Sequence, residues 1–211
     1  MHQGDSLIHF GARQGDLHAV QTALDSGAAI NAVNTAGATA LLLAAEYGHL
    51  ALCRHLIDRG ADLEVRSRHG VTALYMSVHG GQRRIVRLLL KHGASVDISD
   101  RWAMPMLAWA AYNADAWTFH TLMARFSDRE NHDECFRGVL QSAAGRGPRA
   151  DLGIVQTLLD RGFDPYAKDE YGESAVGHWC DLGCSPAIRA LLAAKGITID
   201  DVASDDRPSP G

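Results

Sequence analysis

The residues best suited to metal chemistry lie late in the chain, where His178, Cys180 and Cys184 fall close together. Imidazole and thiolate groups are preferred zinc ligands, and a structural zinc site needs four of them. His178 and Cys180 are two positions apart on a predicted helix and therefore point to different sides. Gly183 should end that helix before Cys184, and no fourth ligand is placed. The pattern does not predict a metal site.

A second pair, His132 and Cys135, has the residue types of a thiol nucleophile and its base. No orienting carboxylate or oxyanion-binding feature can be recognised near this pair. The glycine-rich stretch 145–149 lacks the Lys-Ser/Thr pair of a phosphate-binding loop and follows a predicted helix, so we interpret it as a turn. We predict no catalytic residues and no cofactor. The divergent region 132–184 stays open as an alternative metal-binding or catalytic site.

The elements that carry these residues recur at a fixed period of 33. Three registers keep this period together: Leu41, Leu74 and Leu107; Gly15, Gly48 and Gly81; and the pairs Gly27-Ala28, Gly60-Ala61 and Gly93-Ala94. Chance does not hold three registers in phase over so many residues. Periods of this length are typical of proteins built from stacked repeats.

The unit from 34 to 66 shows how each repeat should fold. Gly37 permits a turn with positive φ, and the hydroxyl of Thr39 can cap the first free amides of a helix. Apolar residues follow at helical spacing until Gly48 ends the helix, and a second apolar helix runs to Gly60. Two helices this short cannot bury their apolar faces alone, so neighbouring units must stack.

With Thr-Ala-Leu at its opening, paired alanines, an early Gly and a late Gly-Ala, this unit resembles the ankyrin repeat. The resemblance covers nearly all of residues 4–199 and implies an all-α ankyrin-repeat solenoid of stacked helix-turn-helix units with short hairpin or loop connections. We place the units at about 1–33, 34–66, 67–99, 100–132, 133–168 and 169–199, followed by a disordered tail over 200–211. The connection 126–138 lacks the expected glycines, which favours a longer helix or an irregular loop there.

Composition limits the location and the partners of the chain. It has 211 residues, a net charge of −5 and four cysteines, which we interpret as reduced thiols. The negative charge disfavours nucleic acid and anionic membranes, and no apolar run approaches the roughly 20 residues of a membrane span. The first ten residues show no secretory signal, so we expect a cytoplasmic protein that is monomeric when free. Only three of the twenty basic residues are lysine, which favours a bacterial source.

The ankyrin resemblance implies that another protein binds to a concave face made by hairpin tips and the first helix of each unit. Mapped onto this chain, that face has arginine and aromatic residues in its middle, the types that anchor protein interfaces. The predicted partner-binding residues are Tyr47, Arg66, Arg68, His69, His79, Arg101, Trp102, Met104, Tyr112 and Asn113. Flanking positions on the same face are Arg13, Gln14, Val33, Thr35, Ala36, Ala38, Glu46, Val71 and Ser99.

Further along the chain the equivalent positions of this face are acidic, so the face should be polarised in charge. These acidic positions are Asp133, Glu134, Glu170, Glu173 and Asp181.

Other conspicuous residues have structural interpretations. We expect His9 and His49 to bond neighbouring backbone or capping hydroxyls, and Trp109 and Trp117 to fill the core where unit four lost its glycines. Ser6 should cap the first helix. The outward side of the first unit should be more polar, as in terminal caps of repeat arrays, and Arg13, Gln14, His18 and Gln21 fit such a cap.

The function that the sequence favours is a protein–protein interaction module without catalytic activity. A more specific version is a bacterial immunity protein that inhibits a toxin or effector enzyme by covering its active site. Small size and the lack of other recognisable domains permit this version without requiring it.

Overall fold

The structure is a computed structural model that describes residues 6–96, 106–113, 115–125, 138–169 and 171–199. Within these ranges the regular elements are helices, with one isolated bridge between Lys168 and Ser174. The predicted all-α fold class is confirmed. None of the described helices combines the length and the apolar character needed to cross a membrane. The chain divides into two compact units, unit 1 (Met1–Met106) and unit 2 (Leu107–Gly211), which are described separately.

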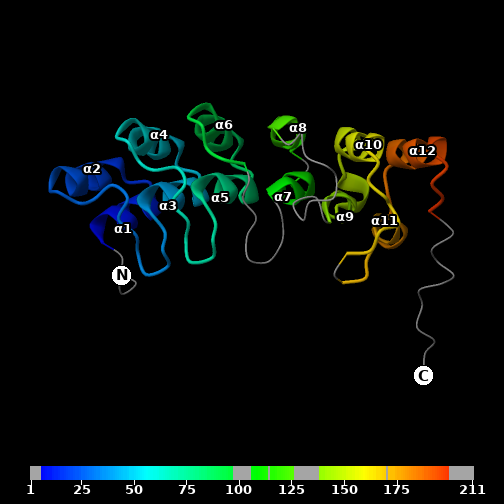
Figure 1. Cartoon of the computed structure of the whole chain (residues 1–211), viewed down its shortest axis with the longest axis horizontal. Helices are drawn as coiled ribbons and strands as arrows, with labels where there is room; N and C mark the ends of the chain where they lie inside the picture. Colours follow the sequence, from blue (N-terminus) through cyan, green and yellow to red (C-terminus); the bar gives the residue numbers. More distant parts are fainter. Residues whose placement is uncertain (1–5, 97–105, 114, 126–137, 170, 200–211) are drawn as a thin grey trace, which may run out of the picture. The chain divides into compact units, whose positions relative to one another are not determined.

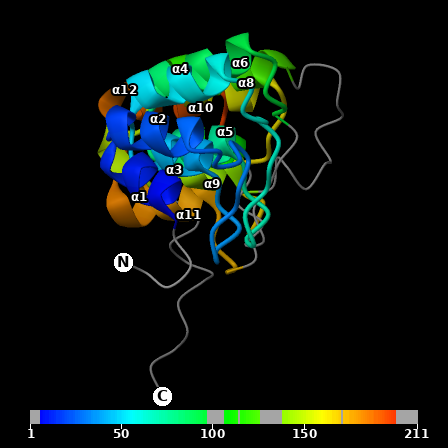
Figure 2. The same cartoon turned by 90° about the vertical axis from the view of Figure 1, so that its left-hand side faces the viewer.

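Among its described residues, unit 1 has three helix pairs: α1 (Leu7–Gln14) with α2 (Leu17–Asp25), α3 (Ala40–Glu46) with α4 (Leu50–Asp58), and α5 (Ala73–His79) with α6 (Arg83–Lys91). Helices α1, α3 and α5 pack side by side as an inner layer, and α2, α4 and α6 form an outer layer (Figures 1 and 2). The segments 26–39 and 59–72 connect the pairs and extend beyond the inner layer as two fingers.

Local sequence explains where these helices begin and end. Thr39 Oγ1 accepts a hydrogen bond from Leu42 N at 3.2 Å, and Thr72 Oγ1 accepts one from Tyr75 N at 3.4 Å, as expected of N-caps. Gly48 follows α3 with φ 81°, and Gly60 follows α4 with φ 84°. The predicted cap at Thr39 and the predicted glycine stops at Gly48 and Gly60 are therefore confirmed.

The start of α1 carries a cap at the predicted residue. Ser6 is the N-cap residue and forms a capping box with His9, whose Nδ1 lies 2.8 Å from Ser6 Oγ and accepts a hydrogen bond from Ser6 N at 3.4 Å. Ser6 therefore occupies the N-cap position that the sequence predicted. His9 Nε2 lies 2.9 Å from Ala32 O, so the predicted structural role of His9 is confirmed.

The outward side of the first helix pair is not uniformly polar. Gln14 and His18 are exposed, as expected, whereas Arg13 and Gln21 are half-buried. The same end of the unit also exposes three large apolar side chains: Leu7, Phe10 and Leu17. The prediction of a more polar outward side rested on the polar members of α1 and α2 and passed over the apolar residues between them.

The core of unit 1 lies between the two layers of helices. It is filled by leucine and isoleucine side chains that recur in successive pairs, among them Ile8, Leu41, Leu52, Leu56, Leu74, Ile85 and Leu89, each at most 1% exposed. Burial of one such side chain contributes about 1.5–3 kcal/mol. Each pair relies on its neighbours for part of that burial, which explains why short helices are stable here.

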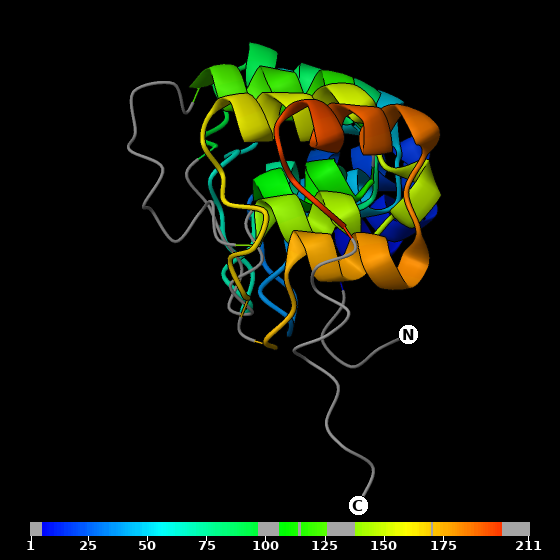
Figure 3. The same ribbon diagram turned by 90° about the vertical axis from the view of Figure 1, so that its right-hand side faces the viewer.

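Unit 2 contains α7 (Met106–Tyr112), α8 (Ala116–Arg125), α9 (Val139–Ala144), the 3-10 turn η2 (Gly147–Arg149), α10 (Leu152–Asp160), α11 (Ala175–Leu182) and α12 (Pro186–Ala194). In Figure 3 the yellow and orange helices α10 and α12 lie in one layer, and α9 and α11 lie in the other. Asp151, Ser174 and Ser185 accept hydrogen bonds from the first turns of the helices that they cap. Stretch 145–149 is a turn, Gly183 ends α11 and Pro186 opens α12, as predicted.

Large aromatics of unit 2 divide between the core and the surface. Phe119 and Trp179 are at most 1% exposed. Trp109 and Trp117 are half-buried, so they contribute to the core on one side only, which corrects the expectation that they fill it. The predictions for the connection 126–138 fall almost wholly outside the described residues, as do His132, Cys135 and the tail 200–211. The boundaries of the six repeat units stay a prediction.

Candidate functional site

The tips of the fingers are tight turns closed by a side chain. Asn34 Oδ1 accepts hydrogen bonds from Ala36 N and Ala38 N, both at 2.9 Å, while Gly37 N donates to Asn34 O at 2.9 Å. The next finger repeats this turn with Ser67, whose hydroxyl accepts from His69 N at 3.2 Å. Such side-chain turns fix the backbone locally. The tips therefore present neighbouring residues in a defined geometry.

Successive fingers are also bonded to one another. Arg68 N donates to Ala36 O at 2.9 Å, and Asn31 Oδ1 accepts from Asp62 N at 2.9 Å. A Cβ added to Gly37 would approach Arg68 N to 2.8 Å, so this close contact requires glycine in addition to its φ of 74°. Glu64 Oε1 then accepts from Ser95 N at 2.8 Å. The fingers form a connected row rather than independent loops.

Five predicted partner-binding residues lie exposed along this row and at the ends of the inner helices: Tyr47, Arg66, Arg68, His69 and His79. We call them the inner face of unit 1. Tyr47 is 50% exposed, and its ring is stacked on that of His49, with centroids 6.4 Å apart and 14° between planes. His49 Nε2 in turn lies 2.9 Å from Arg13 O, which confirms the predicted structural role of His49. This contact fixes the imidazole on which the Tyr47 ring stacks.

Other positions of the mapped face fall elsewhere. Ala38 and Val71 are 4% and 7% exposed, because they form the base of each finger turn and pack into the core. Their expected place on the exposed face was wrong. Arg101, Trp102, Met104 and Ser99 lie outside the described residues, as do the acidic positions Asp133, Glu134 and Glu170. Val33, Thr35 and Ala36 are exposed, as expected.

In unit 2, Tyr112 is the last residue of α7 and is exposed, and Asn113, the next residue, is half-buried. Tyr112 meets the ring of Trp109 edge-on, with centroids 5.9 Å apart, and the guanidinium of Arg146 lies 5.6 Å from its ring centroid. Nε of Arg146 is buried and has no hydrogen-bond partner among the described residues. Tyrosine, tryptophan and arginine, the commonest hot-spot residues, thus form one contact cluster.

Arg146 and Tyr171 were not predicted as site residues. Tyr171 is 81% exposed at the tip of the unit 2 finger, a turn closed by Asp169, whose Oδ1 accepts from Tyr171 N and Glu173 N at 2.9 Å each. The signal was present in the sequence, because Asn34, Ser67 and Asp169 each stand three residues before a positive-φ glycine. Comparing those positions would have located all three tips.

The thiols show no arrangement suited to metal or covalent chemistry in the part of the chain that the structure describes. Cys180 Sγ donates to Ile199 O at 2.6 Å, and no group of three or more His, Cys, Asp or Glu residues is placed to hold an ion there. Cys53 is fully buried, and desolvation raises its pKa to about 12, partly opposed by a backbone hydrogen bond. Burial in apolar surroundings makes a thiol inert.

Comparisons with known proteins support the repeat interpretation. Residues 8–100 match the family model of ankyrin repeats in three copies. An ankyrin repeat domain from Acinetobacter baumannii is 25% identical, with a TM-score of 0.71 over 90% of this chain and 98% of that one. The human ASB11 ankyrin repeat domain is 20% identical, with a TM-score of 0.58 over 90% and 97%. The predicted ankyrin-repeat fold is confirmed.

A third similar structure is a chain from the complex of a predatory endopeptidase of Bdellovibrio bacteriovorus with an immunity protein. It is 23% identical, with a TM-score of 0.70 over 97% of this chain and 100% of that one. At this identity the likeness shows the fold alone. No curated protein matches the chain by sequence.

Proposed function

We propose that this ankyrin-repeat chain is a cytoplasmic, monomeric binding protein without catalysis of its own, and that it holds a partner protein on the inner face of unit 1. The observation that carries the proposal is the row of bonded fingers, which presents exposed Arg66, Arg68 and His69 on a fixed backbone. Tyr47 and His79 extend the same surface at the ends of α3 and α5. Side chains on a fixed backbone lose less conformational entropy on binding, which leaves more of the contact energy as affinity.

The residue types on this face support a protein partner. Arginine offers a planar fork of donors to carboxylates, and tyrosine offers large contact area with only two side-chain torsions to fix. None of the five residues of this face is acidic, and two of them are arginines. A complementary partner surface would be acidic. The Trp109, Tyr112 and Arg146 cluster of unit 2, with Asn113, supplies a further set of anchors.

Affinity capture from the source cells tests this proposal. The wild-type chain should retain one specific protein, and the double variant Arg66→Ala/Arg68→Ala should lose most of it, by about tenfold or more for two hot-spot arginines. Arg149→Ala/Arg189→Ala is the matched control, because it removes two exposed arginines of unit 2 that lie outside the proposed surfaces. Equal capture by all three proteins would show that the inner face of unit 1 is not the contact surface.

A second candidate function is inhibition of a partner enzyme by occlusion of its active site. The structure from the endopeptidase and immunity protein complex motivates it, since a chain there has this fold over its full length. If the captured partner is an enzyme, titration with the wild-type chain should abolish its activity at a molar ratio of about one, as expected for tight binding. Full activity at saturating binding would reject inhibition and leave the binding function intact.

A further inference from the structure

The outer layer of unit 1 changes charge from one repeat to the next. At positions 33 residues apart, α2, α4 and α6 carry His18, Ala51 and Arg84; Gln21, Arg54 and Arg87; and Asp25, Asp58 and Lys91. The buried side of each of these three helices is apolar, whereas the solvent-exposed side becomes more basic from α2 to α4 to α6. The fold therefore does not require these charges, because the same structural positions carry His18, Gln21 and Asp25 in the first repeat.

The basic residues concentrate over α6 and the adjoining surface of α4. Every polar residue within α6 is cationic, and we define the basic face as Arg54, Arg83, Arg84, Arg87, Lys91 and His92, all of them exposed. Helices α4 and α6 pack against each other. Arg54, Arg84 and Lys91 have no ion-pair partner among the described residues.

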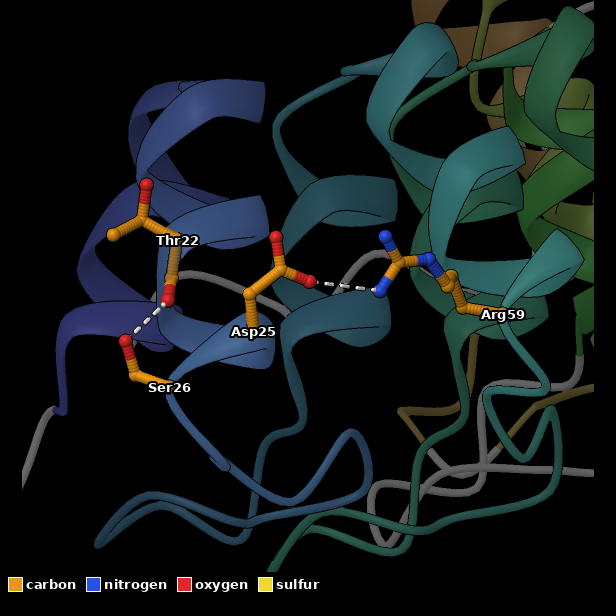
Figure 4. Close-up of polar contacts among 4 residues, drawn as sticks. All are labelled: Thr22, Asp25, Ser26 and Arg59. Carbon is orange, nitrogen blue, oxygen red and sulfur yellow. Dashed lines mark hydrogen bonds and ion pairs between the residues drawn. The ribbon is translucent and has the colours of Figure 1, made fainter.

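The edge of this face is marked by an ion pair between α4 and α2. Arg59 Nη1 lies 3.4 Å from Asp25 Oδ1, and Figure 4 shows the two side chains reaching across the gap between their helices. The Ser26 hydroxyl, which donates to Thr22 O at 2.7 Å, closes the end of α2 beside this pair. Positive charge is thus compensated toward α2, and it accumulates toward α6, where Lys91 replaces the aspartate.

The charges on α6 oppose the stability of their own helix. Arg83 and Arg84 occupy the first turn, where the helix dipole favours acidic residues. Arg83 with Arg87, and Arg87 with Lys91, place like charges one turn apart, which also destabilises a helix. The helix is held instead by its buried side, Ile85, Val86 and the leucines from 88 to 90. Charges that disfavour the local structure indicate selection for another purpose.

We propose that the basic face binds an acidic helical segment of a protein, with carboxylates one turn apart opposite Arg54, Arg84 and Lys91. The arginine fork matches carboxylate geometry, and positions 83 to 91 span about 12 Å, or two helical turns. None of the exposed large apolar side chains in the described residues lies on α4 or α6. The face therefore lacks the apolar anchors of a membrane-inserting surface and the aromatic platforms that stack single-stranded bases. It belongs to the outer layer, so it is separate from the inner face of unit 1.

A defined peptide tests the proposal without knowledge of the natural partner. The probe is a fluorescent, end-capped helical peptide with glutamate at every fourth position, and its counterpart carries glutamine at the same positions. Fluorescence anisotropy should show binding of the glutamate peptide to the full chain and at least about tenfold weaker binding of the glutamine peptide, which cannot form charge-assisted hydrogen bonds.

Two double variants of unit 1, each of which removes two positive charges, show where the peptide binds. Arg54→Gln/Arg84→Gln should weaken peptide binding by about tenfold or more, whereas Arg66→Gln/Arg68→Gln should leave it within about twofold, because charge pairs act at contact distance when salt screens longer ranges. Equal weakening by both variants, no binding to the wild type, or tighter wild-type binding to a short DNA duplex or to phosphatidylserine vesicles would overturn the proposal. The second variant changes the same two arginines whose replacement by alanine should greatly weaken capture of the inner-face partner, so the two proposals fail separately.

Thermal unfolding separates this binding role from a structural one. Arg84→Glu should raise the melting temperature by about 1–3 °C, because it places an acid in the first turn of α6 and relieves repulsion. The same variant should lose the glutamate peptide. A lower melting temperature together with weaker binding would indicate that Arg84 serves the fold, and would contradict the proposal.

Discussion

At the residue scale, two histidines tie unit 1 together through their ring nitrogens. His9 joins Ser6 Oγ at 2.8 Å to Ala32 O at 2.9 Å, and His49 Nε2 reaches Arg13 O at 2.9 Å. A neutral imidazole offers one donor and one acceptor, which suits His9 between a hydroxyl and a carbonyl. These side chains explain why neighbouring glycines are needed as much for space as for backbone conformation.

Gly15 provides a direct test of that point. Its φ is 72°, and a Cβ built there would come within 2.5 Å of His49 Nδ1. Gly15→Ala should therefore lower the unfolding free energy by about 2–4 kcal/mol, from left-handed strain plus a displaced His49 hydrogen bond. Gly27→Ala is the control, since Gly27 has φ 94° but no neighbour within 4 Å, and should cost only about 1–2 kcal/mol. Urea unfolding measures both, and equal losses would contradict the role assigned to His49.

Cys53 makes stability depend on pH in the alkaline range. Its folded pKa is about 12 against an ordinary value of 9.0, so the folded state holds the proton more tightly than the unfolded state. This contribution is complete below about pH 9 and is lost as pH rises toward 12, amounting to roughly 4 kcal/mol in total. Wild type should lose about 2 kcal/mol more than Cys53→Ala between pH 8 and 10.5 in urea unfolding. Parallel losses in the two proteins would show that the thiol does not titrate as proposed.

At the element scale, the sequence predicted what depends on nearest neighbours and on the repeat period. The cap at Thr39, the stops at Gly48 and Gly60 and the buried stripe with Leu41 follow from local chemistry and were confirmed. What depends on packing at the base of the fingers was less predictable. Ala38 and Val71 turn inward there, although their repeat positions had placed them on the exposed face.

The candidate site shows the same division. Exposure of Tyr47, Arg66 and Arg68 follows from their repeat positions, which lie at a helix end and on a finger in unit 1. The stacking of Arg146 on Tyr112 could not be predicted, because it joins residues 34 positions apart across an enlarged turn that breaks the period. Repeat registers predict where a side chain stands, and irregular connections decide which side chains meet.

The finger turn is the element that should control the inner face of unit 1. Asn34→Ala removes the acceptor for Ala36 N and Ala38 N, and should cost about 1–3 kcal/mol because Asn34 is 8% exposed. Asn34→Asp should retain most of the stability, as Asp169 performs the same task in unit 2. Thermal unfolding checks this order, with exposed Thr35→Ala as the neutral control. If the aspartate variant were as unstable as the alanine variant, the turn would not depend on this acceptor.

At the scale of the whole molecule, charge divides between the two units. Unit 1 carries ten lysines and arginines against nine acidic residues, whereas unit 2 carries ten against sixteen. The net charge of −5 therefore belongs to unit 2 and hides a slightly positive unit 1. Total charge alone is a poor guide to partners when the two signs are separated along the chain.

This division predicts how the inner-face partner should associate. An acidic partner is attracted to unit 1 over a distance of about one Debye length, so its association rate should fall by about tenfold as salt rises from 0.05 to 0.5 M, while its dissociation rate changes little. Arg66→Gln/Arg68→Gln should flatten the slope because it removes charge at the contact. Stopped-flow mixing with the captured partner measures both rates. A rate that does not depend on salt, or a slope that the variant leaves unchanged, would mean that the arginine pair does not steer the encounter and that the partner approaches by another surface.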